Sequence, residues 1–179
     1  MHPILATNRL PNSKRTVRVG AIHPYGTTGC LRRLSHMTID PHNLGRFLDA
    51  QQGTYAAALA ELRRGRKTSH WMWFVFPQLA GLGRSPAAQH YAIASMDEAC
   101  AYLAHPALGQ RLRDCLQALQ NLAYGNSAAG VLGKVDAMKL RSSLTLFEAA
   151  GGGPLFSAAL DRWFGGVRDG ATLTLLAPQ

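Results

Sequence analysis

Basic and aromatic side chains adjoin each other in the stretch 63–85, and together they suit an anionic, partly planar ligand. Five basic or imidazole residues lead directly into the apolar run 71–76: Arg63, Arg64, Arg66, Lys67 and His70. Cations can neutralise a phosphate or carboxylate while the face of an indole stacks on a ring. A buried element with a solvated lead-in has the same pattern, so the stretch supports two interpretations.

Within this stretch, His70 is the candidate catalytic residue, because an imidazole can transfer protons near neutral pH. Lys67 lies three positions earlier and would share a helix face with His70 if a helix begins at Thr68, so Lys67 is a ligand-binding candidate. Trp71 and Trp73 are two positions apart, so at most one of them can stack on a ligand, and we select Trp71. Gln78 is a further ligand-binding candidate. The plain alternative for His70 and Gln78 is a hydrogen bond to a neighbouring helix or loop.

A second group of candidates lies in a segment predicted to be helical from residue 136 to residue 150. Lys139, Ser142 and Ser143 are spaced i, i+3, i+4 and therefore share one face, where a cation and two hydroxyls can bind an oxyanion. Arg141 lies on the flank and could stabilise charge together with Lys139. Asp136 is the nearest acidic partner. In the plain interpretation this face is solvated, and the serine hydroxyls bond back to the previous turn.

The charge of the chain is unevenly distributed. Of the formal net charge of +9 over 179 residues, residues 1–36 carry +6 with no acidic residue, and residues 37–179 carry +3. We expect residues 1–36 to be a basic, poorly ordered extension, or to lie outside the native protein if Met37 is the natural start. Residues 37–179 are long enough for a single domain. Their small excess charge makes a nucleic-acid partner an unfavoured hypothesis.

Cysteine usage and hydropathy indicate a cytoplasmic protein. The three cysteines are an odd number and have no zinc-binding spacing, so we predict reduced thiols, no metal and no cofactor. We interpret Cys100 and Cys115 as small core residues. No stretch approaches the ~20 apolar residues of a membrane span. Phosphate-loop and dinucleotide motifs are incomplete at residues 65–68 and 81–86.

Helix signals are nearly continuous from Asp40 onward, which predicts an all-α fold. Asp40 followed by Pro41 predicts the start of a first helix. Further predicted caps and breakers form a series: Thr54, Ser85, Ser95 with Glu98, the glycines 151–153, and Asp169. The apolar run 71–76 fits a buried strand as well as a helix.

Four ordered motifs resemble one protein family. They are HWMWFVFPQL at 70–79, GLGRS at 81–85, YLAHP at 102–106 and KLRSSLTLF at 139–147. The chain, over about residues 43–176, resembles a bacterial family known as domain of unknown function 1810, sometimes labelled calpastatin. The resemblance implies a compact multihelical single domain, which favours a helix for 71–76. It implies no established activity, and no residue pattern supports calpain inhibition.

Three functional hypotheses follow from these residues. The preferred one is a pocket for a small phosphorylated or nucleotide-like anion, in which the two groups of candidates face each other; a hydrolase or transferase reaction would then depend on His70. A weak nucleic-acid binder would need the basic residues of 63–84 on one open surface. A protein-interaction module would expose a tryptophan, Trp71, Trp73 or Trp163, as an anchor.

Overall fold

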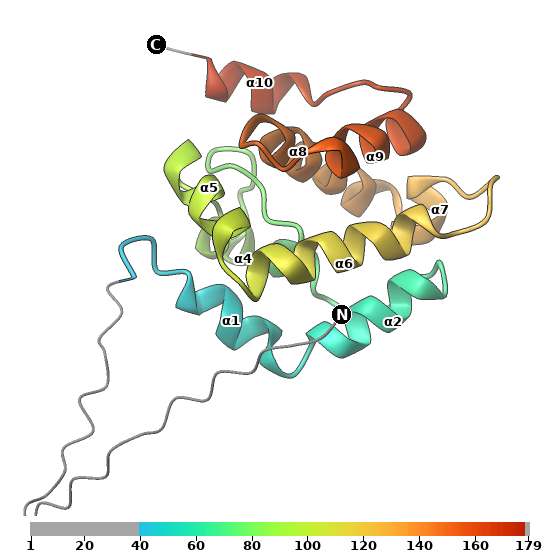
Figure 1. Ribbon diagram of the computed structural model, residues 1–179, viewed down its shortest axis with the longest axis horizontal. Helices are drawn as coiled ribbons and strands as arrows, with labels where there is room; N and C mark the ends of the chain where they lie inside the picture. Colours follow the sequence, from blue (N-terminus) through green and yellow to red (C-terminus); the bar gives the residue numbers. More distant parts are fainter. Residues whose placement is uncertain (1–39, 178–179) are drawn as a thin grey trace, which may run out of the picture. The chain divides into compact units, whose positions relative to one another are not determined.

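The computed structural model describes residues 40–177, and this part of the chain folds into ten α-helices (Figure 1). The helices are α1 Gly45–Gln52, α2 Tyr55–Arg63, α3 Met72–Val75, α4 Pro86–His90, α5 Met96–Ala104, α6 Leu108–Gln120, α7 Ala128–Leu132, α8 Lys134–Ala149, α9 Pro154–Phe164 and α10 Gly170–Leu176. The all-α prediction is confirmed. The predicted extension 1–36 lies outside the described residues.

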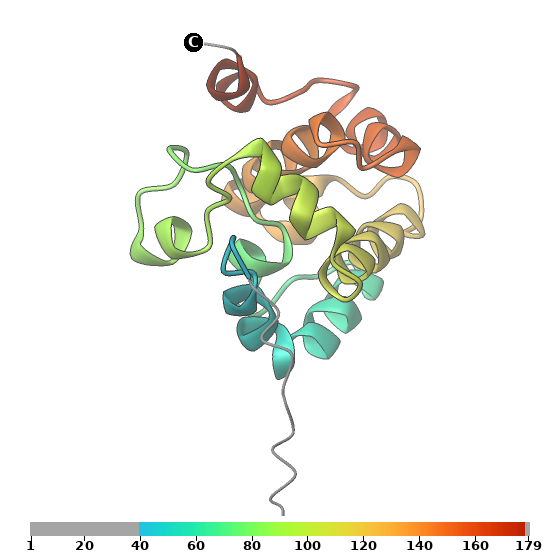
Figure 2. The same ribbon diagram turned by 60° about the vertical axis from the view of Figure 1, so that its left-hand side comes forward.

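Helices α6 and α8 organise the packing. Helix α6 packs against α2 on one side and against α5 and α9 on others, while α8 packs against α5, α7, α9 and α10. Figures 1 and 2, two views that differ by a 60° turn, both show this order: α2, then α6, then α8 with α9, and α10 beyond them. The two predicted groups of candidates lie on either side of α3 and on α8, so their relation depends on how α8 packs in this stack.

Helix α6 follows its apolar pattern closely. Leu108, Leu112, Cys115, Leu116 and Leu119 are all buried, at the i, i+3, i+4 spacing that places them on one face. Burial raises the pKa of the Cys115 thiol to about 12, so this cysteine is an inert core residue as predicted. The same prediction for Cys100 is wrong, because its side chain is exposed.

Helix α8 departs from its expected amphipathic form. Besides Leu140, Leu144 and Phe147, it buries Ser142 and Ser143, which the plain interpretation placed on a solvated face. That interpretation is wrong because neighbouring helices cover α8 on several sides, α10 among them. The spacing of residues along one helix does not predict which other helices pack on its polar side.

Predicted caps hold at three helices and shift at the first. The side chains of Ser85, Ser95 and Asp169 accept hydrogen bonds from the backbones of α4, α5 and α10. Asp40 accepts from the amides of Leu44 and Gly45, so α1 begins at Gly45 and Pro41 is not its first residue.

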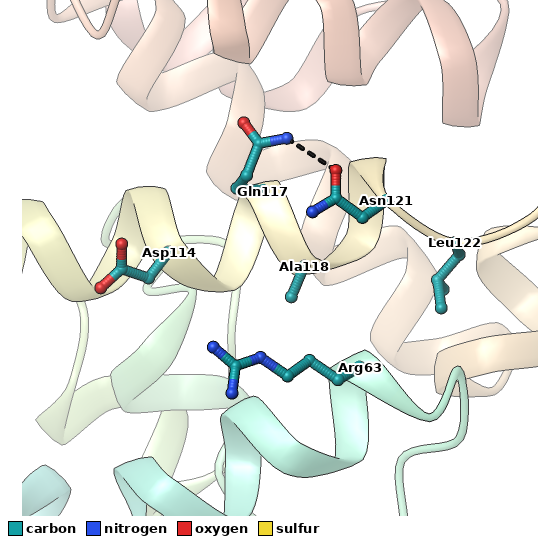
Figure 3. A pocket seen from close by; sticks show the side chains of 6 residues that line it. All are labelled: Arg63, Asp114, Gln117, Ala118, Asn121 and Leu122. Carbon is teal, nitrogen blue, oxygen red and sulfur yellow. Dashed lines mark hydrogen bonds between the residues drawn. The ribbon is translucent and has the colours of Figure 1, made fainter.

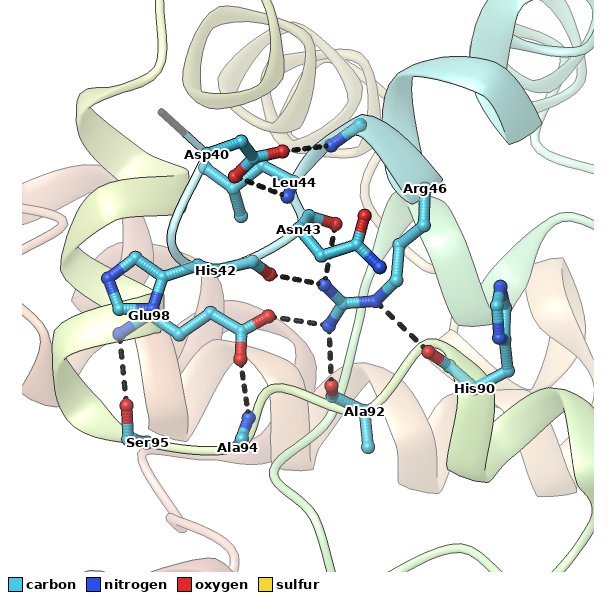
Figure 4. Close-up of polar contacts among 11 residues, drawn as sticks. Asp40, His42, Asn43, Leu44, Arg46, His90, Ala92, Ala94, Ser95 and Glu98 are labelled. Carbon is cyan, nitrogen blue, oxygen red and sulfur yellow. Dashed lines mark hydrogen bonds and ion pairs between the residues drawn. The ribbon is translucent and has the colours of Figure 1, made fainter. Parts of the chain in front are cut away.

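Arg46 joins the start of α1 to α5 and to the loop before it (Figure 4). Its guanidinium donates to the backbone carbonyls of His42, Asn43, His90 and Ala92, and it pairs with Glu98 at 2.5 Å. The second oxygen of Glu98 accepts from the amide of residue 94, one position before the residue that a capping box would use. This clamp holds the start of α1 against the end of α4 and the loop 91–95 that precedes α5.

The short helix α3 resolves the ambiguous apolar run. Only Met72–Val75 is helical, which confirms the helix interpretation for the centre of 71–76. The chain then passes through a loop that is pinned at two points: Ala80 N donates to Ile93 O at 2.8 Å, and Ile93 N donates to Gln78 O at 2.9 Å. The loop 77–85 therefore has a fixed position beside α8 and α10.

Candidate functional site

A cavity of about 340 Å³ lies between α3, the loop 82–85, α8 and the start of α10. Its lining residues are Trp73, Gln78, Leu82, Gly83, Arg84, Ser85, Ala88, Val135, Met138, Lys139, Ser142, Asp169 and Ala171. Its volume is at the lower end of the range of small-molecule sites. Three predicted ligand-binding residues line it: Gln78, Lys139 and Ser142.

Lys67 and Lys139 share one carboxylate. Asp136 Oδ2 lies 2.7 Å from Lys67 Nζ, and Asp136 Oδ1 lies 2.8 Å from Lys139 Nζ. The two predicted groups of candidates, about seventy positions apart in the sequence, thus meet at Asp136. Burial raises the pKa of Asp136, but hydrogen bonds and charge from the two lysines outweigh it and lower that pKa overall. The cluster, which we call the Lys–Asp–Lys cluster, carries one net positive charge.

Each lysine of the cluster also lies over an indole. Lys67 Nζ is 5.0 Å from the ring centroid of Trp71, and Lys139 Nζ is 4.6 Å from that of Trp73. Trp71 is fully buried, whereas Trp73 is partly exposed and lines the cavity. The ring that a ligand can reach is therefore that of Trp73, although the sequence led us to select Trp71.

Glu61 holds the segment that presents Lys67. Its buried carboxylate accepts from the amides and hydroxyls of Thr68 and Ser69 and from Trp71 Nε1, at 2.7–3.2 Å. Burial opposes ionisation of Glu61, but these donors outweigh burial and hold its pKa well below the usual range. Lys67 Nζ additionally donates to Ser69 O at 2.7 Å, so Glu61 indirectly fixes one arm of the Lys–Asp–Lys cluster.

Another wall of the cavity is formed by the loop 82–85, which packs tightly against α4. Gly83 lies so close to α4 that a Cβ built on it would be 2.4 Å from Ala88 Cβ, so a larger residue would displace the loop. Arg84 follows it, exposed and without an ion-pair partner among residues 40–177. The wall thus brings a second cation to the cavity on a backbone with little freedom.

Asp169 contributes a carboxylate acceptor to the cavity, although the sequence predicts it only as the cap of the last helix. It accepts from Thr172 N and Oγ1 at 2.9 and 2.7 Å, and Arg141 reaches its other oxygen at 3.6 Å. Arg141 thus lies beside Asp169 but does not itself line the cavity, and Glu148 pairs with Arg168. The packing of α10 on α8 creates this arrangement, and no local pattern in the sequence indicates it.

Besides Lys67, Trp71 and Arg141, two more predicted site residues do not line the cavity. His70 is exposed and is not one of its lining residues. Ser143 is fully buried, and its Oγ has no hydrogen-bond partner within the described part of the chain. The geometry therefore gives neither residue access to a ligand bound in this cavity.

Two further hollows have a different character. One, of about 300 Å³, lies between α2 and α6 and is lined by Arg63, Asp114, Gln117, Ala118, Asn121 and Leu122 (Figure 3). The other, of about 730 Å³, lies between the start of α1 and the end of α5 and is mainly apolar. Neither contains a residue that the sequence singled out for ligand binding.

The described residues form neither a metal-binding cluster nor a membrane-spanning helix. Between residues 40 and 177, no three His, Cys, Asp or Glu side chains gather in a way that could hold a metal ion. In the same range no helix is both long enough and apolar enough to cross a membrane.

Comparisons with known proteins agree with the motifs at 70–79, 81–85, 102–106 and 139–147. The model of a family described as "Protein of unknown function (DUF1810)" matches residues 41–176. The crystal structure of the conserved hypothetical protein Rv1873 from Mycobacterium tuberculosis is similar, with a TM-score of 0.76 and 47% sequence identity; the match covers 78% of this chain and 100% of that chain. No curated protein matches significantly. The chain belongs to the DUF1810 family.

Proposed function

We propose that this chain binds a small anion that carries a planar group, in the cavity between α3 and α8. One observation carries the proposal: the ammonium of Lys139, held by Asp136 at 2.8 Å, lies 4.6 Å from the ring centroid of Trp73, and both side chains line the cavity. A cation beside an accessible indole can bind a negative group while the ring stacks on a planar one.

The charge around the cavity supports an anion. Arg84 and Lys139 line the cavity, and Lys67 and Arg141 lie within ion-pair distance of Asp136 and Asp169. Four cations thus stand against two carboxylates. Lys67 and Lys139 are only 10% and 20% exposed, so water screens their charge weakly. A phosphate monoester offers the dianionic group that such an excess favours.

A thermal-shift measurement with adenosine 5′-monophosphate tests the proposal. We expect the nucleotide to raise the melting temperature, since a ligand at 100 times its dissociation constant adds about 2.7 kcal/mol to the folded state. Adenosine should give a much smaller shift because it lacks the anion. Lys139→Met should abolish the shift, while Arg66→Ala, which removes an exposed cation outside the cavity, should leave it unchanged. An equal shift in wild type and Lys139→Met would contradict the proposal.

The proposal concerns binding alone and is favoured over the two alternatives. His70, the hypothetical acid or base, does not line the cavity. An interaction module receives little support, since Trp71 and Trp163 are buried, and Trp163 donates to Gln120. A nucleic-acid binder would need the basic residues of 63–84 on one open surface, but the side chain of Lys67 is only 10% exposed. We also propose a cytoplasmic location, which the free thiols of the described cysteines support.

A further inference from the structure

The carboxylate of Asp169 restricts which anions the cavity can accept. Oδ2 of Asp169 accepts two hydrogen bonds from Thr172, whereas the guanidinium of Arg141 lies 3.6 Å from Oδ1, beyond hydrogen-bond distance. A carboxylate oxygen can accept further hydrogen bonds. Asp169 lines the cavity, so its carboxylate can accept a further hydrogen bond from a ligand that brings a donor.

Asp169 is ionised at neutral pH. Burial raises its pKa, but hydrogen bonds from Thr172 and Ser142 and the charge of Arg141 outweigh burial and lower that pKa overall. A bare dianion next to this carboxylate would meet repulsion in a partly buried site. A ligand that fits the whole lining therefore combines an anionic group with hydroxyl or amine donors.

Resting on the proposed function, we infer that the ligand is a nucleoside monophosphate whose ribose hydroxyls donate to Asp169. Its phosphate would meet Lys139 and Arg84, and its base would lie against Trp73. Vicinal ribose hydroxyls are good partners for a carboxylate because both can donate to it, as in dinucleotide sites. The cavity volume of about 340 Å³ favours one nucleotide over a dinucleotide.

Calorimetric titration of the full chain with three probes tests the inference. The probes are adenosine 5′-monophosphate, its 2′,3′-dideoxy analogue and inorganic phosphate. We expect the dideoxy analogue and phosphate to bind at least about tenfold more weakly than the nucleotide, since a hydrogen bond to a charged group is lost. Equal affinities for the nucleotide and its dideoxy analogue would overturn the inference, as would phosphate binding as tightly as the nucleotide.

A matched variant locates the effect. Asp169→Asn keeps an oxygen that can accept from Thr172 and so preserves the α10 cap, but it removes the charge. We expect this variant to weaken nucleotide binding about tenfold and to bind the dideoxy analogue no more weakly than wild type does, because the repulsion of its phosphate is relieved. An unaltered preference for the nucleotide over the analogue in Asp169→Asn would also overturn the inference.

Failure of the inference and failure of the proposed function give different results. If nucleotide and dideoxy analogue bind equally and both lose affinity in Lys139→Met, the anion site stands and the role of Asp169 is wrong. If none of the three probes binds, the proposed function fails and the inference fails with it.

Discussion

Glu61 is a single residue on which a whole segment depends. One carboxylate accepts from both the amide and the hydroxyl of Thr68 and Ser69 and from the indole of Trp71. A charged acceptor with several donors contributes strongly while the set is complete, and when the acceptor is lost its donors, among them the buried indole N–H of Trp71, are left without a partner. The segment that carries Lys67 is therefore held from behind by Glu61.

We expect Glu61→Gln to lower the free energy of unfolding by about 3 kcal/mol, because the new amide places donors against the donors of Thr68 and Ser69. Urea denaturation at pH 7 measures this change. Asp49→Asn, which neutralises an exposed carboxylate on α1, is the matched control and should change stability by no more than about 0.5 kcal/mol. A loss in Glu61→Gln as small as in the control would show that the five hydrogen bonds contribute little.

The difference in unfolding free energy between wild type and Glu61→Gln has a defined pH dependence. The pKa of Glu61 is lowered in the fold, so its contribution is fully present above the usual value of 4.5 and is lost as the pH falls from there through the folded-state pKa. The stability difference between wild type and Glu61→Gln should therefore be constant above that value and shrink below it. A difference that grows on acidification would contradict the assignment.

At the scale of single elements, α8 shows what a helix pattern can and cannot predict. Its extent and its apolar residues follow from spacing and from the glycines at its ends, as they do for α6. The burial of Ser142 and Ser143 does not, because it depends on α10 and other helices packing on the polar side. Local periodicity describes one helix, whereas burial is a property of its neighbours.

Removing either of two hydroxyls on α8 should change the free energy of unfolding in different ways. Ser143 Oγ is buried without a partner, so Ser143→Ala should be neutral or stabilising. Thr145 Oγ1 donates to Arg141 O and accepts from Asp169 N, so the isosteric Thr145→Val should lose about 1–2 kcal/mol. Thermal or urea unfolding of both variants measures this contrast. Equal destabilisation of the two variants would contradict the finding that Ser143 Oγ has no hydrogen-bond partner among the described residues.

At the scale of the whole molecule, the cavity exists only because segments distant in the sequence pack together. The sequence predicted the helical fold and the meeting of two cationic groups, which the shared carboxylate of Asp136 provides. It did not predict that Trp73 rather than Trp71 faces the cavity, since the choice between them depends on where a one-turn helix sits. Nor did it place Asp169 there, because that residue arrives with α10 from the far end of the chain.

The central claim is that an anion with a planar group binds beside Trp73 and Lys139. The three indole N–H groups differ in setting: Trp71 donates to Glu61, Trp163 donates to Gln120, and Trp73 lines the cavity. A ¹H–¹⁵N correlation spectrum, with Trp73→Phe to assign its indole signal, can follow all three during titration with adenosine 5′-monophosphate. The account predicts a saturable shift of the Trp73 indole signal that disappears in Lys139→Met. A saturable shift confined to Trp163, or binding that leaves Trp73 unmoved, would contradict it.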